Sequence, residues 1–182
     1  MNEEMIIKYC APTLAALKTG NLFSCSFESR DQMQSSIRCL NCRLAGKGLR
    51  IMPLRYKDKK ALVYVYRPEK LQRDLQDETA CRLLREHGYC CANPTRCVAC
   101  LREKLSANED FPHEIGLFLG YPPEDVEGFI YRKDEAKCSG CWKVYGNVER
   151  AKRIFARYKK CTDVYLKKWA QGREIEKLTV SA

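Results

Sequence analysis

The cysteines are the residues of this sequence whose type and spacing most directly suggest chemistry. The chain of 182 residues contains 12 cysteines, and three pairs have the spacing Cys-x-x-Cys: Cys39/Cys42, Cys97/Cys100 and Cys138/Cys141. Two sulfurs at this spacing can reach one metal ion when the pair lies in a turn. The segment CSGC at residues 138–141 contains Gly140 and is expected to be such a turn. We therefore name two pairs as candidate metal ligands: Cys97, Cys100, Cys138 and Cys141.

Zinc and an iron–sulfur cluster both remain open as occupants of a cysteine site. No second pair follows residues 138–141 at the distance typical of zinc ribbons, so further zinc ligands would have to come from distant parts of the chain. The spacing Cys90-x6-Cys97-x2-Cys100 resembles the start of the iron–sulfur loop of some DNA-repair glycosylases. Ser106, however, stands where that pattern needs a fourth cysteine. Reduced cysteines that fill apolar space are the simpler explanation for most of the twelve.

Proton transfer and thiol catalysis form a second class of chemistry. His113 and Glu114 are adjacent at the start of an apolar segment and could act as an acid/base pair in a cleft. Cys97 lies in the expected first turn of a helix, where backbone N–H groups and the dipole favour a thiolate. The sequence contains none of the common phosphate-binding, dinucleotide-binding, zinc-protease or serine-hydrolase motifs. An enzyme that uses His113/Glu114 or a reactive cysteine therefore stays one alternative.

Aromatic and ionisable residues concentrate in two late turn regions. The segments FPHEIG, GYPP and CWKVYG place them in turns and at helix starts, where binding residues tend to collect. We predict a ligand-binding site formed by His113, Glu114, Tyr121, Trp142, Lys143 and Tyr145. The alternative is that Trp142 and the tyrosines belong to the core. The leading hypothesis is a small-ligand-binding or accessory protein with its site near residues 111–121 and 138–146, in which a thiol or metal link is left open.

The charge distribution points to a third function. The net charge is +10, and the helical pattern after Asn147 opposes an apolar stripe with a basic side: Arg150, Arg153, Arg157, Lys160, Lys167 and Lys168. Such a side could follow the phosphates of a nucleic acid. A solvated face on a helix that docks through its apolar stripe is the more ordinary explanation. Nucleic-acid binding through the basic C-terminal helix therefore stays an alternative, with an anionic partner.

The elements that must position these residues predict an α+β fold. Helical spacing covers residues 3–17, 29–44 and 69–87, and a short strand covers residues 22–27. The segments LRIMPLRY and ALVYVYRP flank KDKK, which predicts a β-hairpin with a four-residue loop. Pro53 cannot donate to a strand ladder, so the first of these strands should be an edge strand or contain a bulge.

These patterns predict a small antiparallel sheet of about three strands with helices packed on one side. The C-terminal half should be mainly helical: Asn93 and Pro94 start one helix, and residues 111–130 form two short ones around GYPP. We expect one domain over residues 1–182, with an α+β part at 1–90 and a mostly helical part at 91–182.

The compartment is also suggested by the sequence. No run of 18 apolar residues is present, so we expect no transmembrane helix and no membrane partner. Glu3 and Glu4 stand where a secretory signal carries cations, and Lys8 interrupts the apolar run that follows. We therefore predict a cytoplasmic protein whose cysteines are mostly reduced.

Four stretches carry a resemblance to a known family: CAPTLAALKTGNLFS, ALVYVYRPEKL, FPHEIGLFLGYPPEDVEGFI and WKVYGNVERAKRIFARYKKC. Together they resemble an uncharacterised bacterial family, catalogued as a domain of unknown function, over most of the chain. The block FPHEIGLFLGYPPEDVEGFI is the most specific part. The resemblance implies a cytoplasmic bacterial protein and brings no activity or cofactor with it. It also implies that the Cys138/Cys141 pair is a local variant, because an aromatic residue often stands before WKVYG where this sequence has Cys141.

Overall fold

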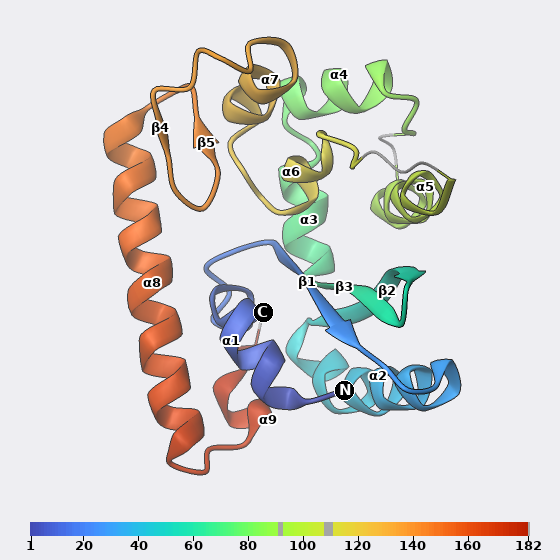
Figure 1. Cartoon of the computed structure of the whole chain (residues 1–182). Helices are drawn as coiled ribbons and strands as arrows, with labels where there is room; N and C mark the ends of the chain where they lie inside the picture. Colours follow the sequence, from blue (N-terminus) through green and yellow to red (C-terminus); the bar gives the residue numbers. More distant parts are fainter. Residues whose placement is uncertain (91–92, 108–110, 182) are drawn as a thin grey trace.

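A three-stranded antiparallel sheet lies at the centre of the fold, which has the expected α+β class (Figure 1). The computed structural model describes residues 1–90, 93–107 and 111–181. The strands are β1 (Gly20–Ser26), β2 (Arg50–Lys57) and β3 (Lys60–Tyr66), and their spatial order is β1-β3-β2. Because β3 pairs with both other strands, β1 and β2 are the edges of the sheet.

The hairpin between β2 and β3 turns through two residues, not the four that the sequence suggested. Asp58 and Lys59 have φ angles of 50° and 57°. Two consecutive left-handed residues are typical of the type I′ turn, whose twist matches that of the flanking strands. The pairing register shifts between Pro53 and Arg55 in edge strand β2, so the predicted irregularity at Pro53 is confirmed.

Helices cover both faces of the sheet, which corrects the expectation of a single covered face. Ala61, Val63 and Val65 of β3 pack in one core cluster with three helices: α1 (Glu3–Leu14), α2 (Arg30–Leu44) and α9 (Ile175–Leu178). The alternate residues Leu62, Tyr64 and Tyr66 pack in a second cluster with four helices: α3 (Pro68–Asp74), α4 (Glu78–Glu86), α5 (Pro94–Ala107) and α6 (Ile115–Phe118). Successive strand side chains point to opposite faces, so one central strand supplies both clusters.

The segment predicted as one helix over residues 69–87 is divided into α3 and α4. The Asp77 carboxylate accepts a hydrogen bond from the backbone N–H of Ala80 at 3.0 Å, which caps the start of α4. Leu71 and Leu83 both lie in the second core cluster, so their apolar spacing continues across the break. That continuity explains why periodicity alone indicated a single helix.

The longest helix, α8 (Val148–Ala170), connects the two ends of the molecule. It starts at Asn147, whose side chain accepts a hydrogen bond from the N–H of Arg150 at 2.9 Å. Figure 1 shows α8 running along one side of the molecule from a small hairpin, β4 (Cys138–Ser139) and β5 (Lys143–Val144), to α9. The sequence analysis did not predict this hairpin. The basic residues of α8 are exposed, as both explanations of its basic side require.

Arg67 is a buried cation that holds several chain segments together. Its side chain is 2% exposed and donates hydrogen bonds to the carbonyls of Thr13 and Leu14 at 2.7 Å and Lys47 at 3.1 Å. It also donates to the carbonyl of Val180 at 2.7 Å. A guanidinium has five donors, so Arg67 can connect the end of α1, the segment before β2 and the C-terminal segment through one side chain.

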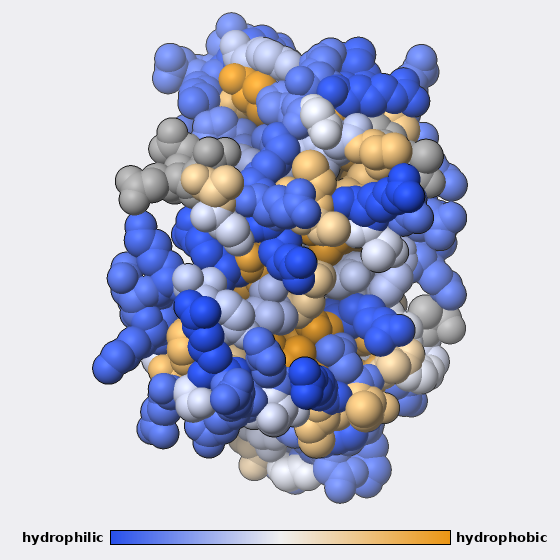
Figure 2. Space-filling view, turned by 90° about the vertical axis from the view of Figure 1, so that its right-hand side faces the viewer, coloured by the Kyte–Doolittle hydropathy of each residue, from blue (hydrophilic) through white to orange (hydrophobic). Residues whose placement is uncertain are grey.

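The distribution of hydrophilic and hydrophobic residues on the surface is typical of folded proteins. On the face that Figure 2 shows, hydrophilic residues dominate and hydrophobic ones lie in small groups between them. Among residues 1–90, 93–107 and 111–181, no helix combines the length and the apolarity that a bilayer crossing requires.

Candidate functional site

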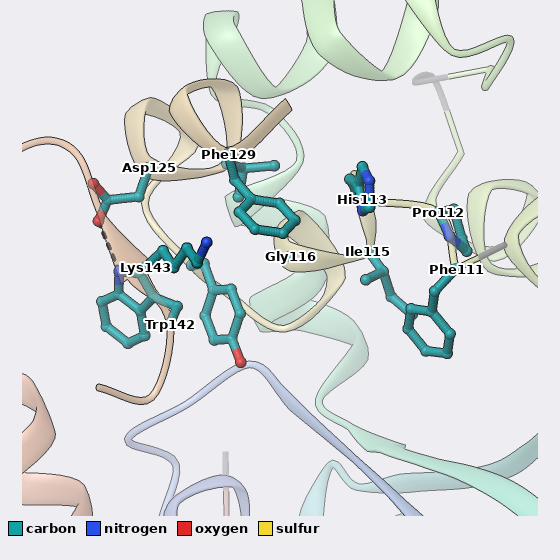
Figure 3. Close-up of a pocket in the computed structure, with 11 residues that line it drawn as sticks. Phe111, Pro112, His113, Ile115, Gly116, Asp125, Phe129, Trp142 and Lys143 are labelled. Atoms are coloured by element: carbon teal, nitrogen blue, oxygen red, sulfur yellow. Dashed lines mark hydrogen bonds between the residues drawn. The ribbon is translucent and has the colours of Figure 1, made fainter. Parts of the chain in front are cut away.

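An apolar pocket of about 380 Å³ lies where α6, α7 (Pro123–Tyr131) and β5 meet (Figure 3). We call it the Phe129 pocket and define it by the residues that line it: Phe111, Pro112, His113, Ile115, Gly116, Tyr121, Asp125, Val126, Phe129, Trp142 and Lys143. Eight of these residues come from the two regions in which the sequence analysis placed a binding site, and Asp125, Val126 and Phe129 come from α7 between them. The fold therefore brings both regions together around one cavity.

Phe129 lies between the two basic side chains of the pocket (Figure 3). The His113 ring meets the Phe129 ring edge-on, with 5.0 Å between centroids. On the other side, Lys143 Nζ lies 5.6 Å from the centroid of the same ring. The electron-rich face of an aromatic ring attracts a cation, so Phe129 orients Lys143 at the pocket.

Asp125 fixes the hairpin to α7. Its carboxylate is 3% exposed and accepts three hydrogen bonds, each at 2.7 Å: from the Trp142 indole N–H and from the backbone N–H groups of Tyr145 and Gly146. Hydrogen bonds to an ionised acceptor are about twice as strong as those between neutral groups. We call this arrangement the Asp125 latch. It places Trp142 and Lys143 at the pocket, since both belong to the latched hairpin.

Two glycines allow the walls of the site to approach closely. A Cβ at Gly128 would overlap the ring carbon Cγ of Tyr145, and a Cβ at Gly116 would lie 2.8 Å from Val126. Real Cβ atoms essentially never come that close to another side chain. The glycines therefore serve packing between α6, α7 and the hairpin.

Trp142 is both a core residue and a wall of the pocket. It is 8% exposed, stacks on Tyr121 with 4.9 Å between ring centroids, and meets Phe155 of α8 edge-on at 4.5 Å. Burial raises the pKa of Tyr121 to about 12, so its hydroxyl is neutral at physiological pH. Trp142 thus belongs to a core cluster and also lines the pocket, so the two predicted alternatives are compatible.

The six predicted ligand-binding residues divide into two groups. His113, Tyr121, Trp142 and Lys143 line the Phe129 pocket. Tyr145 does not; its hydroxyl donates a hydrogen bond to the carbonyl of Lys133 at 3.1 Å. Glu114 is buried on a different side, where it accepts a hydrogen bond from the Tyr89 hydroxyl at 3.0 Å and lies 3.5 Å from Lys104 Nζ.

The separation of His113 and Glu114 bears on the acid/base hypothesis. The two residues are neighbours in sequence, but His113 contacts Phe129 whereas Glu114 contacts Tyr89 and Lys104. An acid/base pair must reach the same reacting atoms. His113 can thus contact a ligand in the Phe129 pocket, whereas Glu114 does not line this pocket.

The four candidate metal ligands lie in two distant places. Cys97 and Cys100 belong to α5, and Cys138 and Cys141 belong to the β4–β5 hairpin, which Figure 1 shows on opposite sides of the molecule. Cys97 is buried, and its thiol donates a hydrogen bond to the carbonyl of Cys90 at 3.0 Å. Within the described ranges, no three His, Cys, Asp or Glu side chains are grouped closely enough to hold a metal ion. Cys91 lies outside the described residues.

Phe129 and Asp125 were not among the predicted site residues. The sequence contains a signal that could have found both, because they are four residues apart and so share one face of α7. An aspartate at a helix start is usually explained by its favourable interaction with the helix dipole. This explanation gives no indication that Asp125 also accepts hydrogen bonds from another segment. Its partners come from residues 142–146, and local pattern does not reveal such a contact.

Comparison with known proteins gives one match. A family model described as "Protein of unknown function (DUF3793)" matches residues 6–179. No match was found among curated proteins or among solved structures.

Proposed function

Because the chain belongs to the DUF3793 family, whose description names no activity, we propose a function from the Phe129 pocket itself. The proposal is that the protein binds a small, flat, mainly apolar molecule that carries one anionic group. The anionic group would lie at Lys143, and the apolar body would lie against Phe129 and Trp142, with His113 on the other side of Phe129. The protein would act as a binding or accessory protein.

The observation that carries this proposal is the position of Lys143, whose ammonium group lies beside the Phe129 ring and is not paired with any carboxylate of the described residues. Within the described part of the chain, Lys143 Nζ contacts the Phe129 ring and has no carboxylate or carbonyl partner. Asp125 is the pocket's carboxylate, and its oxygens are already engaged by three donors of the hairpin. A bound anion would therefore meet a free ammonium rather than displace an internal ion pair.

The size and the lining of the pocket limit the ligand. A cavity of about 380 Å³ is near the lower end of the range for small-molecule sites, which runs from about 300 to about 1,000 Å³. Apolar walls with a few convergent polar groups are typical of such sites. A one- or two-ring carboxylate fits this description better than a nucleotide or a peptide.

The compartment belongs to the same proposal. We infer a cytoplasmic bacterial protein, and one observation supports a reducing compartment. Cys39 and Cys42 are exposed free thiols, although their spacing would allow them to meet. Exposed thiols persist where glutathione and thioredoxin keep them reduced.

A matched pair of ligands tests the proposal. The Trp169→Phe variant leaves Trp142 as its single tryptophan, so quenching of its fluorescence reports on the pocket. We expect 2-naphthoate to quench saturably and to bind about fivefold more tightly than neutral 2-naphthalenemethanol, because one partly exposed ion pair contributes about 1 kcal/mol. In the same background, Lys143→Met should remove this preference.

Two further variants control the interpretation. Phe129→Ala should weaken both compounds, since it removes the apolar surface that they share. Lys133→Met removes an exposed lysine whose side chain does not line the pocket and should change nothing. The proposal is wrong if neither compound quenches saturably below about 2 mM, or if quenching is the same with and without Phe129.

A further inference from the structure

Lys18 is a buried lysine that lines a second cavity. It follows α1, is 5% exposed, and faces a space of about 380 Å³ between α1, the β4–β5 turn and α8. We call this space the Lys18 cavity. Besides Lys18, its lining is formed by Tyr9, Pro12, Asn21, Tyr121, Cys141, Phe155, Tyr158, Lys159, Thr162 and Asp163. Tyr121 also lines the Phe129 pocket, so the two cavities share one side chain.

Among the described residues, the ammonium of Lys18 lacks the hydrogen-bond partners that two half-buried lysines have. Lys70 Nζ donates to the carbonyl of Ala16 at 2.9 Å, and Lys104 Nζ donates to the carbonyl of His87 at 2.6 Å. Lys18 Nζ lies 5.0 Å from the centroid of the Tyr121 ring. In the part of the chain that the structure describes, no hydrogen-bond acceptor or carboxylate completes its coordination.

The buried tyrosines and thiols around Lys18 provide no negative charge at neutral pH, and the carboxylate of Asp163 lies at the exposed edge of the cavity. Burial raises the pKa of Tyr121 and of Tyr158 to about 12 each. Burial also raises the pKa values of the Cys10 and Cys141 thiols, although Lys18 partly opposes this. At the rim, Asp163 is already paired with Lys159 at 3.1 Å, and both are exposed.

A desolvated ammonium among neutral groups releases its proton more easily. Burial lowers the pKa of Lys18 from 10.5 to about 8, and the thiols of Cys141 and Cys10 oppose this shift only in part. At pH 7.5 a much larger fraction of Lys18 is then the free amine than the about one part in a thousand of an ordinary lysine. The free amine is the nucleophilic form, and desolvation in an apolar pocket is one way in which proteins activate lysine.

We propose that Lys18 is a nucleophilic amine that forms an imine with a small aldehyde admitted to the Lys18 cavity. The nitrogen lone pair attacks the carbonyl carbon, the C=O π electrons move to oxygen, and a proton passes from nitrogen to that oxygen. The carbinolamine hydroxyl then takes up a proton and leaves as water when the C–O bond breaks, the nitrogen lone pair forms the C=N bond, and the remaining N–H proton is released to solvent. The aldehyde is the single co-reactant, and no oxidant or reductant takes part.

The aldehyde should be compact and apolar or aromatic. Phe155 and Tyr158 of α8 and Tyr121 form aromatic walls. This inference does not depend on the Phe129 pocket, because Lys18 does not line it. The Phe129→Ala variant should therefore keep the reactivity of Lys18 unchanged even if ligand binding at the Phe129 pocket is lost.

Reductive trapping in the unaltered protein tests the proposal. The protein is treated with limiting benzaldehyde and sodium cyanoborohydride at pH 7.5, and the modified lysines are located by peptide mass spectrometry. We expect Lys18 to be modified at least about tenfold faster than the exposed Lys152. Its rate should rise with pH to a midpoint near 8, whereas that of Lys152 should still rise above pH 9.

Variants and a competitor separate this proposal from anion binding. Lys18→Arg keeps a cation in the cavity and should abolish the fast phase, and Lys152→Arg should leave it intact. Circular dichroism of Lys18→Arg checks that the fold is retained. Modification of Lys18 no faster than Lys152 overturns the proposal. So does a pH midpoint near 10, and so does benzoate binding at Lys18 with no trapped adduct, which would identify an anion site instead.

Discussion

Replacing Asp125 by Asn removes the charge of the Asp125 latch while keeping its shape. The carboxylate now accepts from the Trp142 indole on one oxygen and from the N–H groups of Tyr145 and Gly146 on the other. An asparagine offers one oxygen and one NH₂ group. If the oxygen keeps the two backbone donors, the NH₂ group faces the indole N–H, and two donors then oppose each other in a buried place.

The expected cost follows from these three bonds. The lost indole bond to a charged acceptor is worth about 1.5–3 kcal/mol, and each retained bond weakens from charged to neutral by about 0.5–1 kcal/mol. We therefore expect Asp125→Asn to lower the free energy of unfolding by about 3 kcal/mol. Glu124→Gln changes an exposed carboxylate next to it in the first turn of α7 and should cost less than about 0.5 kcal/mol.

A double-mutant cycle isolates the contact with the indole. Trp142→Phe removes the N–H group that would oppose the asparagine, so Asp125→Asn should cost about 1–2 kcal/mol less in that background. Free energies of unfolding are measured from urea titrations followed by far-UV circular dichroism, which does not depend on the tryptophan. A cost below about 1 kcal/mol for Asp125→Asn, or additivity within about 0.5 kcal/mol, would refute the latch.

Three other changes test separate parts of the structure, each by urea unfolding. Arg67→Met should destabilise the fold by about 3–5 kcal/mol, because it leaves several buried carbonyls without a donor; a loss below about 1 kcal/mol would show that water replaces the guanidinium. Gly128→Ala should cost about 2–3 kcal/mol despite the better helix propensity of alanine, since its Cβ overlaps the Tyr145 ring. Gly46→Ala, where the new atom meets nothing within 4 Å, should stay within about 0.5 kcal/mol. The folded-state pKa of Lys18 is depressed to about 8 from 10.5, so the unfolded chain binds more protons between these values and the Lys18 contribution to stability rises with pH in that window. The wild-type protein should therefore gain about 2 kcal/mol relative to Lys18→Met between pH 7 and pH 9.5, and a constant difference between the two would contradict a depressed pKa.

Local periodicity was enough to predict most elements of the fold. The stripe of Met33, Ile37, Leu40 and Leu44 indicated α2, and all four residues are buried as expected. The sequence also contained the signal for a sheet covered on both faces. The run ALVYVY in β3 is continuously apolar rather than alternating, which is typical of a strand buried on both sides.

Contacts between distant segments could not be predicted in the same way. Lys18 and Arg67 look like surface residues in sequence, yet they are 5% and 2% exposed because the end of α1 packs beside β3 and α8. The acid/base pair suggested by two adjacent residues was likewise not found in one place. His113 and Glu114 sit at the start of a four-residue helix, where consecutive side chains point in different directions, so adjacency did not make a pair.

Residues of the two late turn regions can be sorted by whether the fold already uses them. Asp125, Gly128 and Tyr145 each satisfy a hydrogen bond or a close approach inside the protein, so their presence is explained without a ligand. His113 and Lys143 are exposed, and the interaction that the structure gives each of them is with the Phe129 ring at the mouth of a cavity. The hydrogen bonds of the Asp125 latch do not involve the Lys143 side chain, so they would also form with an uncharged residue at position 143. The basic groups are thus the part of this site that internal packing does not use, and the proposal of a ligand with an anionic group rests on them.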